Sequence, residues 1–168
     1  MAIDPDNVEL RRFLSSDADW LVERHAALYA ERDGFDGSFR DVVADIVDGF
    51  LRDHDPATER GWIAAAGDRR LGSIFCVQSG EEGIAKLRLF LLEPDARGLG
   101  LGQRLLEACI KFAKDKEYRS MRLWTHESHR AACVLYARYG FLCVDAFPVR
   151  SFGQDLVEQT WELDLQIA

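Results

Sequence analysis

The chain has 168 residues, of which 48% are hydrophobic and 30% are charged. This balance is typical of one globular domain with its own core, residues 1–168, and the length leaves no room for a separate nucleic-acid-binding domain. The net charge of −8 repels phosphate backbones and anionic membrane surfaces at long range. We therefore expect neither nucleic acid nor a membrane as a partner.

The beginning of the chain and its cysteines indicate the compartment. Residues 1–6 lack the basic and apolar regions of a signal peptide, and no apolar run approaches the roughly 18 residues of a membrane span. The cysteines form no C-x-x-C pair for zinc or redox chemistry. We expect a cytoplasmic protein without a metal site, whose cysteines are buried free thiols: Cys76, Cys109, Cys133 and Cys143.

Hydrophobic spacing predicts strands and helices in the order β α α β β β α β α β β. In chain order they are a strand at 8–13, a helix ending near Tyr29, a helix at 39–50, strands at 61–66, 71–78 and 84–92, a helix at 101–112, a strand at 121–125, a helix at 132–139, and strands at 141–147 and 160–165. This order predicts an α/β protein in which helices cover a mixed sheet.

A glycine-rich loop, Arg97-Gly98-Leu99-Gly100-Leu101-Gly102-Gln103, joins a predicted buried strand to a helix. Glycines let the backbone approach a ligand closely, and the first amides of a helix favour an anion. We expect this loop to hold phosphate, although a plain connecting turn is an alternative. Gln103 breaks the G-x-G-x-x-G pattern and no P-loop lysine follows, so a nucleotide-binding switch is disfavoured.

Two motifs resemble signatures of the GCN5-related N-acetyltransferase (GNAT) family. Arg97-x-x-Gly100-x-Gly102 resembles motif A, whose loop wraps the pyrophosphate of acetyl-coenzyme A (acetyl-CoA), and Ala132-x-x-Leu135-Tyr136-x-x-x-Gly140-Phe141 is similar to a second signature. The resemblance covers 8–165 and implies the GNAT acyl-CoA N-acyltransferase fold, a mixed, mostly antiparallel sheet of about seven strands flanked by about four helices. Residues 20–50 also resemble the acetyltransferase half of MarR-type regulator fusions.

The resemblance implies acetyl-CoA as co-substrate. Phe90, Leu91 and Leu92 match strand positions whose backbone pairs with the pantetheine arm, and an amide near Leu92 polarises the acetyl carbonyl. The pyrophosphate would be held by the amides of Arg97, Gly98, Leu99, Gly100, Leu101, Gly102 and Gln103. His129 departs from the family, since many members have asparagine there, which puts its contact to the pantetheine region in doubt.

Acetyl transfer needs an acid for the departing thiolate and a neutral amine. The resemblance implies Tyr136 as the acid, whereas its position on an apolar stripe also fits a core tyrosine. The resemblance assigns no base. His126 and Glu127 follow a predicted strand end and are base candidates, with a solvated polar loop as the alternative.

Strand periodicity offers a hint about the acceptor amine. Lys86, Arg88, Phe90 and Leu92 alternate along the predicted strand, so we expect them on one face. Two cations on that face would suit an acceptor with a carboxylate or another anionic group, whereas an internal ion pair is the alternative.

The end of the first predicted helix lies in the region where GNAT members commonly shape their acceptor site. The resemblance therefore implies His25, Tyr29 and Glu31 as further acceptor-binding candidates.

We expect an N-acetyltransferase that moves an acetyl group from acetyl-CoA to a primary amine of a small molecule or peptide by direct transfer. A thiol nucleophile is disfavoured because Cys109 and Cys133 lie within apolar helix stripes. The alternative is a non-catalytic acyl-CoA-sensing module that binds a protein partner, and Tyr136 favours catalysis. The oligomeric state is open, with a homodimer as one option.

Overall fold

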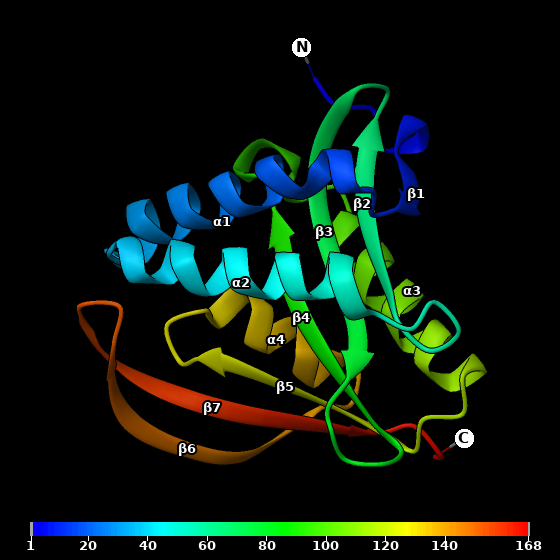
Figure 1. Cartoon of the computed structure of the whole chain (residues 1–168), viewed down its shortest axis with the longest axis vertical. Helices are drawn as coiled ribbons and strands as arrows, with labels where there is room; N and C mark the ends of the chain where they lie inside the picture. Colours follow the sequence, from blue (N-terminus) through cyan, green and yellow to red (C-terminus); the bar gives the residue numbers. More distant parts are fainter. Residues whose placement is uncertain (1, 168) are drawn as a thin grey trace. The chain divides into compact units, whose positions relative to one another are not determined.

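The computed structural model describes residues 2–167, which form two compact units (Figure 1). The first unit contains 2–13, 55–121 and 165–167, and the second contains 14–54 and 122–164. Each unit thus gathers segments that are distant in the sequence. The single domain expected from the length stays a prediction.

The first unit is an antiparallel array of strands with one helix packed on it. Its strands β1 (Glu9–Arg12), β2 (Arg60–Ala66), β3 (Arg69–Gln78) and β4 (Ile84–Leu92) pair in that order. Helix α3 (Leu101–Asp115) packs against β3, and its apolar stripe is buried there. One contact between them is the Cys109 thiol, 3.8 Å from the Phe75 carbonyl oxygen. The 3₁₀ turns Pro5–Asn7 and Pro94–Ala96 complete this unit.

The second unit combines two long helices, a short helix and a long hairpin. Its elements are a 3₁₀ turn at Ser15–Asp17, α1 (Ala18–Asp33), α2 (Gly37–Asp53), β5 (Ser120–His126), whose first two residues belong to the first unit, α4 (Arg130–Arg138), β6 (Leu142–Ser151) and β7 (Gln154–Asp164). Helices α1 and α2 lie side by side, and β6 and β7 form a long antiparallel ribbon (Figure 1). Within residues 2–167, no helix is long and apolar enough to cross a bilayer.

The described residues contain seven strands and four α-helices in the predicted order, which confirms the predicted fold class. Three boundaries were wrong by four residues or more, and one of them is the end of β6, which lies at Ser151 rather than at residue 147. Helix α1 continues past Tyr29 to Asp33, where Gly34 at φ +70 ends it in the left-handed conformation. Strand β7 begins at Gln154 rather than at residue 160, because its pairing with β6 runs unbroken to the Ser151–Gln154 pair.

The four cysteines are free, but they are not all buried. Cys76 and Cys109 are buried in the first unit, as expected. Cys133 is partly exposed and Cys143 is exposed, so the prediction of four buried thiols was wrong. For Cys143 the reason lies in β6, whose residues from Leu142 to Phe147 are exposed on both faces. Cys133 lies on α4, where Tyr136 is the one residue that is buried.

Candidate functional site

The glycine loop lies between the end of β4 and the start of α3, in the first unit. Gly98 and Gly100 both have a φ of +77, a left-handed conformation that favours glycine. A Cβ atom added at either position would meet no atom of residues 2–167 within 4 Å. Gly100 is the N-cap of α3 and has no side chain to accept from the first helical amides. The loop therefore offers amide donors together with an open approach.

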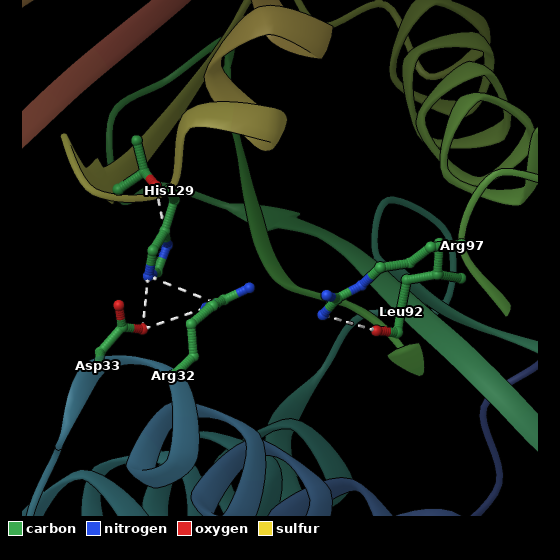
Figure 2. A network of polar contacts seen from close by, with 6 residues as sticks. Arg32, Asp33, Leu92, Arg97 and His129 are labelled. Atoms are coloured by element: carbon green, nitrogen blue, oxygen red, sulfur yellow. Dashed lines mark hydrogen bonds and ion pairs between the residues drawn. The ribbon is translucent and has the colours of Figure 1, made fainter. Parts of the chain in front are cut away.

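Arg97 places a positive charge beside this helix N-terminus. Its guanidinium Nη2 reaches back to the carbonyl oxygen of Leu92, the last residue of β4, at 3.5 Å (Figure 2). The side chain is otherwise exposed. A helix N-terminus and an exposed guanidinium together favour an anion such as a phosphate group.

Strand β4 carries a bulge just before the loop. Arg88 pairs with Phe75 and Leu91 pairs with Ser73, so β4 has one residue more than β3 over this stretch. Leu89 lies in the bulge with a φ of +52, which is strained for leucine. The backbone of β4 is therefore irregular just before Leu91 and Leu92, two of the residues implied to bind the cofactor.

Because of the bulge, the side chains of β4 do not alternate as the sequence predicted. Ser73 and Phe75 are two residues apart on β3 and share a face, so their partners Leu91 and Arg88 share that face too. Lys86 pairs with Val77 and lies on the same face as Arg88. Leu92, which was expected beside them, instead pairs with Gly72 on the opposite face. The strict alternation assumed from the sequence fails because the bulge adds one residue.

Lys86 and Arg88 place two positive charges on one half-buried face. Burial lowers the pKa of Lys86 to about 8, and repulsion from Arg88 acts in the same direction. Burial also lowers the pKa of Arg88, while the charge of Glu59 opposes this effect. This face is therefore more favourable for an anionic group than for another cation.

Tyr136 lies on α4 in the second unit and is only 4% exposed. Its ring centroid is 5.6 Å from that of Phe141 and 6.3 Å from that of Trp161. Its backbone carbonyl also accepts from the Phe141 amide at 3.0 Å. This packing fits a core tyrosine and holds the ring in one place, which a general acid also requires.

A polar network joins the end of α1 to the start of α4 within the second unit (Figure 2). His129 Nε2 lies 2.9 Å from Asp33 Oδ2, and each side chain is 7% exposed. The same carboxylate oxygen accepts from Arg32 Nε at 3.3 Å, and Thr125 Oγ1 lies 3.4 Å from His129 Nδ1. Both ring nitrogens of His129 thus have protein partners, so a cofactor contact through either nitrogen would displace one.

Seven rings pack next to this network in what we call the histidine–aromatic cluster. Its members are His25, Tyr29, Phe35, Phe39, His126, His129 and Phe152. Neighbouring ring centroids are 4.7 to 6.1 Å apart. The rings come from α1, α2, the end of β5, the start of α4 and the β6–β7 turn. Phe35 comes from the connection between α1 and α2, so the cluster joins six segments of the second unit.

The three histidines of the cluster are held neutral by their surroundings. Burial lowers the pKa of His25 to about 4, although its Nδ1 hydrogen bond to the Leu21 carbonyl opposes this. Burial likewise lowers the pKa of His126, helped by the charge of His129. Burial also lowers the pKa of His129, although the hydrogen bond that its ring donates to Asp33 opposes this. Among the described residues, neither His25 Nε2 nor His126 Nδ1 has a hydrogen-bond partner.

The structure brings only some of the predicted acceptor and base residues together. His25, Tyr29 and His126 meet in the cluster, whereas Glu31 and Glu127 are exposed. Sequence reasoning missed further members of the network and the cluster: Arg32, Asp33, Phe35, Phe39, Thr125 and Phe152. One signal was available, because His25, Tyr29 and Asp33 are spaced four residues apart and share a helix face.

Residues 2–167 contain no group of three or more His, Cys, Asp or Glu side chains that could hold a metal ion. The groups described above that could bind or transfer charge or protons are the loop amides, the β4 backbone, the two β4 cations, Tyr136 and the histidines.

Comparisons with known proteins agree with this arrangement. Residues 18–141 match the family model described as acetyltransferase (GNAT) family. A mycothiol acetyltransferase of Arthrobacter sp. (strain FB24) is 30% identical over 150 residues, 84% of this chain and 45% of that protein. N-acetyltransferase 8F1 of Rattus norvegicus is 27% identical over 128 residues, 74% of this chain and 52% of that protein.

A solved structure shares the fold. The chain is similar to yncA of Salmonella typhimurium, solved with its cofactor acetyl-CoA, at a TM-score of 0.73 and 16% identity over 96% of each chain. The chain spans about half the length of the curated relatives it matches. Since the family model covers well over half of the sequence, the chain belongs to the acetyltransferase (GNAT) family.

Proposed function

We propose that this chain is an acetyl-CoA-dependent N-acetyltransferase that moves an acetyl group directly to a primary amine of a small molecule or peptide. One observation carries the proposal: a bulged strand, β4, runs through a loop with left-handed glycines into the uncapped N-terminus of α3. Such a segment supplies strand edges for an extended arm and helix amides for a phosphate. Membership of the GNAT family supports the same activity.

The loop residues fit the diphosphate part of acetyl-CoA. Gly98 and Gly100 leave open space where any side chain would stand, and Arg97 adds a guanidinium beside the helix N-terminus. The amides from Arg97 to Gln103 would hold the pyrophosphate, and the backbone of Phe90, Leu91 and Leu92 would hold the pantetheine arm. When bound, acetyl-CoA supplies an activated acetyl group, so the protein needs no nucleophile of its own.

In the second unit, Tyr136 serves as the general acid that gives its proton to the departing sulfur. Its buried, packed ring holds the hydroxyl in a fixed place. We favour His126 over Glu127 as the base, because His126 is held neutral and its Nδ1 has no partner among the described residues. A neutral imidazole can take up the proton that the neutral amine releases as its nitrogen attacks the acetyl carbon, either directly or through water.

The acceptor carries an anionic group in addition to its amine. Lys86 and Arg88 share one half-buried face and repel each other, so a carboxylate or similar group between them would be stabilised by both charges. His25 and Tyr29 contribute to acceptor binding indirectly, because they belong to the packed cluster that also holds the base candidate His126. Some relatives are mycothiol acetyltransferases, which places small-molecule amines first among the acceptors to test.

Three further features belong to this proposal. The protein acts in the cytoplasm, as cysteines without disulfide bonds among the described residues suggest. It works without nucleic acid or a membrane. A homodimer is consistent with the exposed apolar residues of β6, Leu142, Val144 and Phe147.

A panel of amines tests the activity directly. Free amino acids, their decarboxylated counterparts, short peptides and aminoglycosides are each mixed with acetyl-CoA, and release of coenzyme A is followed. The proposal requires release with at least one amine and none without an amine. Tight acetyl-CoA binding without release for any amine would instead support the acyl-CoA-sensing module.

A further inference from the structure

The structure assigns a role to Ser73 of β3: its hydroxyl holds the bulge of β4 and thereby orients the Phe90 amide toward the acyl group. This makes Ser73 a positioning residue, and the inference rests on the proposed function. The Ser73 hydroxyl donates to the carbonyl oxygen of Leu89 at 2.6 Å. Ser73 is fully buried, so water does not compete for this hydrogen bond.

The hydrogen bond falls where the backbone is strained. Leu89 has a φ of +52, and non-glycine residues in this region persist only when their surroundings hold them there. Leu89 and Phe90 together stand opposite the single residue Ile74, since Ser73 pairs with Leu91 and Phe75 pairs with Arg88. The hydroxyl of Ser73 thus contacts the one peptide group that a regular ladder would not accommodate.

The direction of one peptide group fixes the direction of the next amide. All peptide bonds described are trans, and in a trans peptide the C=O and N–H groups point in opposite directions. Because the Leu89 carbonyl is directed at Ser73, the N–H of Phe90 is directed away from Ser73 and from β3. The backbone N–H of Glu93 donates to the Leu71 carbonyl at 2.8 Å and so points toward β3. Because N–H directions alternate along a strand, the N–H of Leu92 points away from β3, as that of Phe90 does.

Gly72, the residue before Ser73 on β3, lets β4 approach closely at the bulge. A Cβ at Gly72 would lie 2.7 Å from the Leu91 carbonyl oxygen and 3.0 Å from the Leu92 side chain. Any larger residue there would push β4 away from β3 and lengthen the Ser73 hydrogen bond. Gly72 and Ser73 therefore act together, one by allowing close approach and the other by holding the bulge.

An amide held in advance contributes most when negative charge develops on its acceptor. A donor fixed before the reaction needs no reorganisation as charge builds on the acetyl oxygen, whereas a mobile peptide must first be ordered. Ser73 thus acts on the rate through Phe90 and does not itself touch the reacting atoms. Loss of its hydroxyl should reduce kcat more than it weakens acetyl-CoA binding.

The test compares Ser73→Ala, Leu89→Gly and the double variant with the wild type. For Ser73→Ala we expect kcat to fall at least tenfold, with the calorimetric Kd for acetyl-CoA changed less than threefold. A crystal structure of Ser73→Ala should show Leu89 outside the positive φ region. Glycine adopts positive φ readily, so the double variant should recover kcat to within threefold of Leu89→Gly.

Cys76→Ala is the matched control, since it also removes one buried atom from β3, at a residue that pairs with Leu87 outside the bulge. It should lower the melting temperature while leaving kcat unchanged. If Ser73→Ala does not fold, Ser73→Cys, which keeps a weaker donor, should give a reduced kcat.

Two results would overturn the inference: a Ser73→Ala enzyme with kcat within twofold of the wild type, or Leu89 still at positive φ in its crystal structure. A wild type that neither binds acetyl-CoA nor releases coenzyme A with any amine would instead defeat the proposed function. The φ of Leu89 is measured in a crystal structure whether or not the protein is active. This measurement separates failure of the Ser73 inference from failure of the proposed function.

Discussion

The glycine loop with its strand and the histidine–aromatic cluster are built in different ways. The loop depends on the backbone: glycines at positive φ, a bulge, and helix amides without a side-chain cap. The cluster depends on side chains, with seven packed rings and a buried carboxylate. Ligand binding by the loop should therefore be sensitive to a side chain added at a glycine. The stability of a cluster of buried neutral histidines should instead be sensitive to a fall in pH.

The largest expected effect is on stability at low pH and concerns the cluster. His25 has a pKa of about 4 in the folded protein against 6.5 in the unfolded chain, so the unfolded chain binds more protons between these values. The free energy of unfolding should therefore fall as the pH drops from 6.5 toward 4, by about 3 kcal/mol for this residue. Urea unfolding at several pH values measures this.

A His25→Leu variant removes that titration. Its stability should change less between pH 7 and pH 4.5 than that of the wild type. An identical pH dependence in both proteins would show that His25 does not carry the acid sensitivity of the cluster.

The next effect concerns Tyr136, a packed residue that the proposal gives a chemical role. Tyr136→Phe keeps the ring and removes the hydroxyl, so kcat should fall about 100-fold while acetyl-CoA affinity changes little. Tyr139→Phe, three residues along the same chain segment, is the control and should keep normal turnover. A Tyr136→Phe enzyme within a few-fold of wild-type kcat would return Tyr136 to a purely packing role.

A smaller effect, on the choice of acceptor amine, concerns Arg88. This residue lies on β4, but we expect it to act through its side chain. An amine that carries a carboxylate should be preferred to the same amine without it by roughly tenfold in kcat/KM. Arg88→Met should abolish this preference and leave acetyl-CoA affinity unchanged. Arg60→Met, which removes a partly buried cation from β2, should keep it. Equal wild-type rates for both amines would contradict the assignment.

The sequence predicted the loop better than the cluster, for physical reasons. Gly98 and Gly100 signal a left-handed backbone directly, and the order of strands and helices follows from hydrophobic spacing. The bulge was missed because leucine gives no local sign of a positive φ, and the strand register that reveals the bulge exists only in the folded sheet. The Asp33–His129 pair joins residues 96 positions apart, which no local pattern predicts.

Acetyl-CoA binding to two glycine variants tests the central claim most directly. Gly100→Val and Gly67→Val both place a side chain on a residue at positive φ with open space around it, but Gly67 lies in the β2–β3 turn. Both should lose similar stability from backbone strain. By calorimetry, Gly100→Val should raise the acetyl-CoA Kd at least tenfold, whereas Gly67→Val should bind as the wild type does. A folded Gly100→Val protein with wild-type affinity would contradict the account.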